Sequence, residues 1–278
     1  MASHSPSTGR PRTCVLALVA IVLALGACAT KPPAGDLEAQ RYYKEINDPL
    51  EPMNRQILKF NRGFERVILT PVAKTYRAVL PAPARKGVYN LLHNLRSPVI
   101  FGNDVMQGEG KRAGNTLLRF VLNTTLGIGG LFDVATRLGV ESHDEDFGQT
   151  LATHGVGEGF YLVLPIFGPS SPRDGIGLAV DILIDPIFWI LRSENLNYVN
   201  YIRTGVEGVD IYARNLDQIE ELKRTSLDYY AALRSTYRQN RRSEILNGAE
   251  EDPDFPEYLF EDEFEEEEKP PADGGRRE

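Results

Sequence analysis

The sequence predicts an all-α fold, and three observations indicate it. Apolar residues recur every three or four positions in most segments between residues 48 and 248, which is the period of an amphipathic helix. Strand patterns are weak, because the best of them, "YLVLPIF" at residues 161–167, contains Pro165, which disfavours an interior strand. No linker rich in proline, glycine or serine divides this stretch, so we expect a single domain over residues 48–248.

The first helix is predicted to begin at "DPLE". Asp48 can cap it, a proline follows at the first helical position, and Glu51 completes a capping box. Pro71 is expected to end this helix or to start the next one. The apolar positions of the two helices are Ile57, Phe60, Phe64, Val67, Ile68, Val72, Tyr76, Val79 and Leu80.

Three further stretches continue the helical pattern. Residues 88–95 predict a short helix that ends before Pro98, and residues 111–122 predict another. Residues 205–248 carry apolar side chains mostly every three or four positions, which indicates one helix or two in series with a length of about 60 Å. "NG" at its end is a typical helix stop.

The amino-terminal segment has the layout of a secretory signal. Arg10 and Arg12 precede an uncharged run at residues 14–27, which is shorter than the ~20 residues of a bilayer-spanning helix. "LGAC" resembles the lipobox of bacterial lipoproteins, which implies cleavage after residues 1–27 and acylation of Cys28. Two or more acyl chains anchor a protein stably. Ala29 favours export to the outer membrane by the same analogy, and residues 28–47 then form a tether.

Charge and cysteine content narrow the function classes. The net charge is −8, but residues 249–278 hold 14 acids and 3 bases, so the body of the chain is nearly neutral and predicts no nucleic-acid partner. This acidic tail is expected to be disordered, although its aromatic residues leave folding onto a partner open. Of the two cysteines, one lies in the signal and the other is Cys28, so a mature disulfide or cysteine metal site is excluded.

The most apolar stretch after the signal is "IGLAVDILIDPIFWIL", residues 176–191. Asp181, Asp185 and Pro186 interrupt it, so it is too short and too polar to span a bilayer. Composition favours a buried pair of core helices around the proline. The alternative is a pair of helices that lies in one membrane leaflet.

The glycine cluster in "NTTLGIGGLFDVATRLG", residues 123–139, does not fit a phosphate-binding loop. Phe132 stands where the final glycine of G-x-G-x-x-G would be, and no Lys-Ser/Thr pair follows as in a P-loop. The cluster therefore predicts a backbone bend at Gly127, Gly129 and Gly130.

Two other candidates for chemistry are weak. "GPSSP" around Ser170 lacks the second glycine of the G-x-S-x-G nucleophile turn, which disfavours a serine hydrolase. "ESHDEDFGQTLATHG", residues 141–155, lacks the spacing of a zinc or EF-hand site. We interpret it as a polar turn with a helix-capping aspartate, and we expect no metal, no cofactor and no catalytic residue.

Several blocks of the chain together resemble the MlaA (VacJ) family of Gram-negative outer-membrane lipoproteins. They are "DPLEPMNRQILKFNRGFE" (48–65), "NLRSPVIFGNDVMQG" (94–108), "RFVLNTTLGIGGLFDVA" (119–135) and "DFGQTLATHGVGEGFYLVLPIFGPSSPRDGIG" (146–177). With the lipobox and the terminal helix, the resemblance covers about residues 25–247. Ala152, His154 and Phe160 depart from the family pattern, which puts local details of the last block in doubt.

The resemblance implies a particular fold and a function that does not involve catalysis. It implies a single ring-shaped domain of amphipathic helices that lies in the inner leaflet of the outer membrane, with a long carboxy-terminal helix and a central channel. The expected function is removal of mislocalised phospholipid from the outer leaflet and its transfer to a soluble periplasmic carrier, MlaC, which maintains lipid asymmetry. Trimeric porins are the expected membrane partners.

Site residues follow from the same resemblance. Cys28 is expected to be the lipidated anchor, and Phe60, Asn61 and Phe64 are expected to form a rim or gate of the channel. The three glycines are backbone bends, either in the channel wall or in a plain turn between helices. Two alternatives stay open: a structural lipoprotein that scaffolds porins without a lipid path, and a phospholipid hydrolase that uses Ser170.

Overall fold

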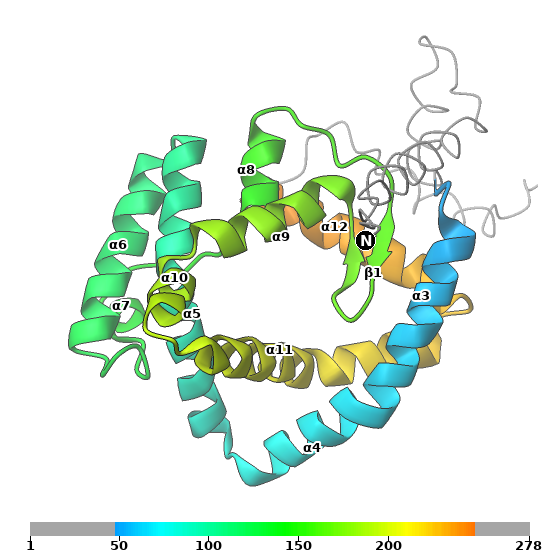
Figure 1. Ribbon diagram of the computed structural model, residues 1–278, viewed down its shortest axis with the longest axis horizontal. Helices are drawn as coiled ribbons and strands as arrows, with labels where there is room; N and C mark the ends of the chain where they lie inside the picture. Colours follow the sequence, from blue (N-terminus) through cyan, green and yellow to red (C-terminus); the bar gives the residue numbers. More distant parts are fainter. Residues whose placement is uncertain (1–47, 248–278) are drawn as a thin grey trace, which may run out of the picture.

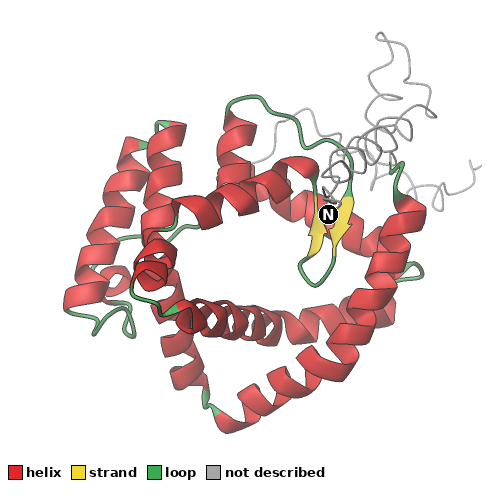
Figure 2. Ribbon diagram, in the orientation of Figure 1, coloured by secondary structure: helices red, strands yellow, loops and turns green. Residues whose placement is uncertain are grey.

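The computed structural model describes residues 48–247, and most of them are helical, as the sequence predicts (Figure 2). The chain runs through α3 (Glu51–Phe64), a π-helix (Glu65–Leu69), α4 (Thr70–Val79), α5 (Ala82–Gln107) and α6 (Gly110–Thr125). The short α7 (Val134–Arg137) and α8 (Phe147–Thr153) precede two strands, β1 (Leu162–Leu164) and β2 (Gly168–Ser170). The last elements are α9 (Pro172–Ile184), α10 (Pro186–Ser193), α11 (Asn197–Thr225) and α12 (Tyr229–Ile245).

The helices are arranged as a ring when the molecule is viewed down its shortest axis (Figure 1). Helices α3 and α4 form one side and α11 lies along α4, while α5 and α10 form the opposite side. Helix α12 packs against α8 and β2 and completes the ring. Helix α6 packs along α5 on the outside of the ring, with α7 at its end. The prediction of a helical ring is confirmed.

Helix boundaries agree with the sequence prediction at one proline and differ at another. Pro71 starts the next helix, one of the two predicted outcomes, because the π-helix Glu65–Leu69 leads directly into α4 and leaves the proline in the first turn of that helix. The prediction that a helix ends before Pro98 is wrong, since α5 continues through it. α6 packs along α5, and these tertiary contacts offset the backbone hydrogen bond that Pro98 cannot donate.

The carboxy-terminal pattern forms two helices that are not in line. Residues 226–228 separate them, and Asp228 caps α12 by accepting the Tyr230 N–H at 2.9 Å. From this corner α12 turns back along the other side of the ring (Figure 1). Helix α11, at 29 residues, is about 44 Å long. The two-helix form of the prediction is the correct one, and the turn between the helices is what lets the ring close.

Burial is inverted relative to an ordinary soluble domain. Among the described residues, 12 hydrophobic residues are buried, 19 polar or charged ones are buried, and 34 large hydrophobic ones are exposed. Isolated exposed apolar residues are normal, but soluble proteins do not expose apolar side chains on this scale. None of the helices within residues 48–247 has the length and apolar content needed to cross a bilayer.

The apolar helices α9 and α10 illustrate this inversion. No residue of α10 is buried, and Leu183, Trp189 and Ile190 are 60%, 47% and 60% exposed. The indole N–H of Trp189 donates to the Leu183 carbonyl oxygen at 2.7 Å, so its polar atom is satisfied within the protein. The prediction of a buried core pair is therefore wrong: composition cannot tell an apolar helix that faces inward from one that faces outward.

Candidate functional site

A β-hairpin projects from the rim of the ring toward its opening (Figure 2). Its antiparallel strands pair Leu162 with Ser170 and Leu164 with Gly168. The tip is apolar, with Ile166 and Phe167 exposed by 55% and 65%. Ile166 has a φ of 71°, a left-handed conformation that is costly for a β-branched residue. A strained apolar tip in this place needs a support, and α3 provides it.

Two asparagines of α3 hold the hairpin. Asn54 donates its amide to the Tyr161 carbonyl oxygen at 3.0 Å and accepts the Val163 N–H at 2.9 Å. Asn61, two helical turns further on, repeats the pattern: it donates to the Leu164 carbonyl oxygen at 2.9 Å and accepts the Ile166 N–H at 2.8 Å. Both amides are buried. Each side chain thus acts as a short substitute for a neighbouring strand.

The base of the hairpin is tied to α12 through Tyr161. Its ring packs edge-on against Tyr230 at 5.8 Å between centroids and tilted against Tyr237 at 5.9 Å. Asp48 accepts hydrogen bonds from Asn54 at 3.1 Å and from the Tyr230 hydroxyl. Burial, together with the hydrogen bond to Asp48, raises the pKa of Tyr230 above its ordinary value, so its hydroxyl stays protonated. The hairpin, the start of α3 and α12 therefore form one assembly.

Arg241 fastens α12 to the helices on the other side. Its guanidinium contacts both oxygens of Asp146, the cap of α8, at 2.6 and 2.7 Å, and Asp174 of α9 at 2.9 Å. Arg241 is 8% exposed. Burial acts to raise the pKa of Asp146, but the hydrogen bonds and charge of Arg241 outweigh it and lower that pKa to about 2. The predicted capping aspartate is confirmed, and it has this second role.

Gly127, Gly129 and Gly130 form a tight turn that packs on α5, outside the ring. A Cβ on Gly127 would lie 2.2 Å from the Phe132 carbonyl oxygen, and one on Gly130, at φ +100°, would lie 2.5 Å from Asn94 Cβ. Asn94 donates to the Gly129 carbonyl oxygen at 3.3 Å. The residues that flank the bend are apolar and exposed: Leu126, Ile128, Leu131 and Phe132.

An ionic cluster fixes the far end of this turn. Arg119 contacts both oxygens of Asp133 at 3.0 Å and donates to the Thr136 hydroxyl at 2.9 Å. Asn123 donates to Asp133 at 3.2 Å and accepts the Ala135 N–H at 3.0 Å. Burial acts to raise the pKa of Asp133, but its hydrogen bonds with Thr136 and Arg119 lower it to about 2. The glycine-rich segment 123–139 therefore forms a backbone bend, as predicted, and not a phosphate-binding loop.

The remaining predicted residues fall in different places. Phe60 and Phe64 lie on α3 close to Asn61 in the sequence. Phe60 is 58% exposed and Phe64 is half-buried, and neither takes part in the hydrogen bonds that Asn61 makes to the hairpin. Cys28 lies outside the described residues. Asn61 is thus the predicted rim residue whose contacts reach the hairpin. Sequence reasoning missed Asn54, although its spacing of seven residues from Asn61 placed both amides on one face of a helix.

The side chains considered as catalytic candidates form hydrogen bonds or ion pairs within the fold. The Ser170 hydroxyl donates to the Ser171 carbonyl oxygen at 3.3 Å, and Ser171 caps α9 by accepting the Asp174 N–H at 3.1 Å. His143 contacts Asp104 at 2.9 Å, and Arg112 pairs with Glu145 at 2.6 Å. Within residues 48–247 no group of three His, Cys, Asp or Glu side chains could hold a metal.

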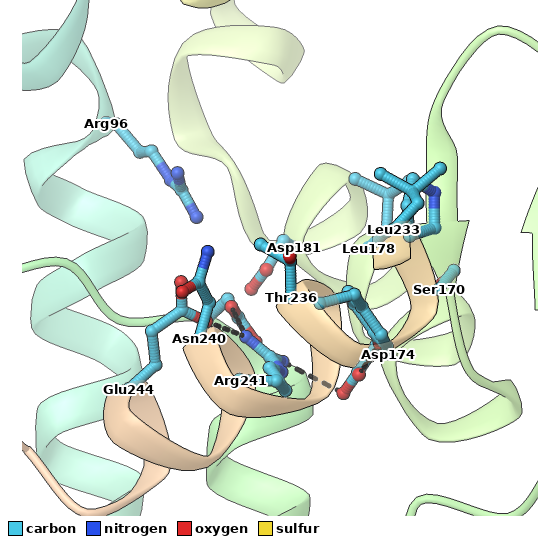
Figure 3. Close-up of a pocket in the computed structure, with 13 residues that line it drawn as sticks. Arg96, Ser170, Asp174, Leu178, Asp181, Leu233, Thr236, Asn240, Arg241 and Glu244 are labelled. Atoms are coloured by element: carbon cyan, nitrogen blue, oxygen red, sulfur yellow. Dashed lines mark hydrogen bonds and ion pairs between the residues drawn. The ribbon is translucent and has the colours of Figure 1, made fainter. Parts of the chain in front are cut away.

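Two cavities between helices of the described part of the chain bear on function. An apolar one of about 740 Å³ lies where α4, α5 and α11 meet, with Val72, Val79, Val206 and Val209 in its walls. Tyr76 also lines this cavity and donates its hydroxyl to Asp210 at 2.9 Å. Burial, together with this hydrogen bond, raises the pKa of Tyr76 to about 12. The other cavity, of about 390 Å³, lies between α5, α9 and α12 and is lined by charged and apolar side chains (Figure 3).

These features define a class of protein: a ring of amphipathic helices, polar in its interior contacts and apolar on its surface, with a hairpin set at the opening. Comparison with known proteins narrows the class to a family. The MlaA lipoprotein family model matches residues 46–244. The chain therefore belongs to the MlaA lipoprotein family.

Individual relatives agree with this assignment. An intermembrane phospholipid transport system lipoprotein MlaA from Haemophilus influenzae is 34% identical over 243 residues, which cover 86% of this chain and 92% of the relative. The protein of the same name from Escherichia coli strain K12 is 35% identical over 208 residues, or 73% of this chain and 80% of the relative. A solved structure from work on the structural basis for maintenance of bacterial outer membrane lipid asymmetry superposes with a TM-score of 0.64 at 35% identity, covering 72% of this chain and 99% of the other.

Proposed function

We propose that this protein removes mislocalised phospholipids from the outer leaflet of the outer membrane and passes them to a periplasmic carrier, so that lipid asymmetry is maintained. The observation that carries the proposal is the inverted burial. Thirty-four large hydrophobic residues are exposed in the described part of the chain while its polar groups are bonded to one another inside. A ring of this kind places apolar surface against acyl chains and polar groups along a path for headgroups.

The location follows from the same chemistry. Exposed apolar faces on helices such as α10 suit a position within one leaflet, and Cys28, outside the described residues, is the proposed lipidated anchor. The family and its relatives, named as lipoproteins of an intermembrane phospholipid transport system, support this position. A trimeric porin is the proposed neighbour in the membrane, and a soluble carrier that resembles MlaC is the proposed recipient of the lipid.

The hairpin is the proposed control point of the path. Its apolar tip, Ile166 and Phe167, projects toward the opening, and the buried amides of Asn54 and Asn61 set its position. Neither step of lipid transfer requires a covalent reaction, and Ser170 is bonded to the backbone rather than to a base. We therefore propose a transport role without catalysis.

The experiment is deletion of the gene in the source bacterium, followed by an assay of phospholipid exposed at the cell surface. We expect surface phospholipid to rise and to return to normal when the wild-type gene is restored. Unchanged surface phospholipid would contradict the proposal and would favour a structural scaffold for porins. A chain truncated after residue 248 should complement the deletion if the acidic tail is dispensable for transfer.

Purified protein distinguishes the transport role from a hydrolase. The proposal expects intact phospholipid to co-purify with the detergent-extracted protein and no fatty acid to be released. Release of fatty acid that is lost on Ser170→Ala substitution would overturn it.

A further inference from the structure

The cavity between α5, α9 and α12 contains an arginine whose bonding capacity is largely unused. Arg96 extends from α5 into the space opposite α12 (Figure 3). Among the described residues, its one hydrogen bond is a long contact of 3.5 Å from its guanidinium to the Glu145 carbonyl oxygen. An arginine offers five N–H donors in a planar fork that suits phosphate. Arg96 is half-buried, so neighbouring residues restrict the orientation of its side chain.

Polar groups of α12 complete the same wall. Asn240 points toward Arg96 in Figure 3, and Thr236 lies one turn before it on the same helix. Neither side chain has a hydrogen-bond partner among the described residues, whereas nearby Tyr237 donates to Asp174, and Arg241 donates to Asp146 and Asp174. Arg96, Thr236 and Asn240 therefore all offer hydrogen-bond donors at one cavity.

Four acidic residues line the cavity, and they differ in their partners. Asp181 accepts hydrogen bonds from the Asn103 amide at 3.0 Å and the Phe147 N–H at 3.1 Å, and it interacts with the charge of Arg96. Asp146 and Asp174 are neutralised by Arg241 at 2.6 and 2.9 Å, and Arg173 also pairs with Asp174 at 2.9 Å. Glu244, at the far end of the wall, has only one of its oxygens on Arg241 and a side chain that is 53% exposed. Its other oxygen, Oε1, accepts no hydrogen bond within residues 48–247, so it can bind a cation that approaches from solvent.

The ends of the cavity differ in polarity as well. Leu178 and Leu233 form an apolar flank beside the polar wall, and the volume of about 390 Å³ suits a headgroup and the start of its glycerol rather than whole acyl chains. A free phosphate ion has no apolar part that could pack against Leu178 and Leu233, whereas a phospholipid has one, which favours a lipid as the ligand.

We propose that this cavity is a subsite for the phosphoethanolamine headgroup of a phospholipid, with the phosphate bound by Arg96 and Asn240 and the ammonium bound at Glu244. The subsite rests on the proposed transport function and gives it a headgroup preference. Phosphatidylethanolamine would satisfy both ends, and phosphatidylglycerol only the phosphate end.

Native mass spectrometry of the detergent-purified full chain tests the subsite, with short-chain phosphatidylethanolamine, phosphatidylglycerol and diacylglycerol as probes. Arg96→Gln should weaken binding of both phospholipids about tenfold or more, the effect of losing a charge-assisted hydrogen bond, and leave diacylglycerol unchanged. Glu244→Gln should weaken phosphatidylethanolamine alone. Arg137→Gln, at an exposed position on α7, is the control for loss of a positive charge.

A second pair of variants keeps the test independent of the folding of Arg96→Gln. Asn240→Asp, on the exposed side of α12, should weaken both phospholipids by repulsion, whereas Gln239→Glu adds the same charge one residue away and should not. Binding by Arg96→Gln and Asn240→Asp equal to their controls would overturn the subsite while leaving transport intact. Displacement of lipid by equimolar inorganic phosphate would identify a free-anion site instead. A wild-type chain that binds no phospholipid would overturn the proposed function together with the subsite.

Discussion

Replacing Arg241 with methionine should weaken the closure of the ring more than any exposed substitution on α12. The change leaves Asp146 and Asp174 without the guanidinium that contacts them at 2.6 to 2.9 Å. Breaking a buried ion pair by removing one partner costs about 3–5 kcal/mol. The lowering of the Asp146 pKa from 3.8 to about 2 alone corresponds to roughly 2.5 kcal/mol, which agrees in size. We expect the Tm of the purified protein in detergent to fall by about 10 °C.

The pH dependence of this loss identifies its cause. Asp146 binds a proton near pH 3.8 in the unfolded chain but only near pH 2 in the folded one, so its stabilising effect is complete above pH 3.8 and is lost as the pH falls toward 2. The difference in Tm between wild type and Arg241→Met, followed by circular dichroism, should therefore shrink over that interval. Gln239→Met, on the exposed face of the same helix, is the matched control. A difference that stays constant from pH 7 to pH 2 would refute the electrostatic reasoning.

Three further predictions concern the turn, the hairpin and the anchor. Gly127→Ala and Gly130→Ala should each destabilise more than Gly129→Ala, because the added Cβ lies 2.2 Å from the Phe132 carbonyl oxygen at Gly127 and 2.5 Å from Asn94 Cβ at Gly130. Gly129→Ala, with open space around it, should cost only about 1–2 kcal/mol from its positive φ, and a lower Tm for Gly129→Ala than for the other two variants would contradict this packing. Asn61→Leu leaves the Leu164 carbonyl oxygen and the Ile166 N–H unpaired, at a cost of about 1–3 kcal/mol each. The Ile166 amide should therefore exchange its hydrogen faster than in the wild type. Unchanged exchange would show that Asn61 does not hold the hairpin. Cys28→Ala should leave an uncleaved, missorted precursor, and normal membrane fractionation of that variant would refute the lipobox.

Helix content and some caps could be predicted because they depend on neighbours in sequence. The three- and four-residue apolar period located α3 and α11, and a capping aspartate was expected where Asp146 caps α8. The predicted capping box at the first helix is wrong: Leu50 is the N-cap of α3 without a side-chain hydrogen bond, Glu51 is its first residue, and Asp48 accepts the Asn54 amide instead. Pro98 misled the prediction, since the packing of α6 along α5 was not visible in the local sequence. Local sequence patterns therefore predict which segments are helical, but not whether a helix continues through a proline such as Pro98.

The direction in which an apolar face points could not be predicted from composition. α10 is as apolar as a core helix, yet it buries no residue, because the ring leaves its outer face without a protein partner. The clamps at Arg241 and Asn54 were also missed, since their partners lie 67 to 109 positions away in the chain. Asn61 could be singled out through the family resemblance, but its partner strand could not.

Transfer of lipid by the purified protein tests the central claim most directly. Full-length protein is placed in vesicles with a labelled phospholipid, and the label that reaches a soluble carrier resembling MlaC is measured over time. The proposed function predicts transfer above that of empty vesicles, with the label still on intact phospholipid. Transfer equal to that of empty vesicles, or label recovered as free fatty acid, would contradict it.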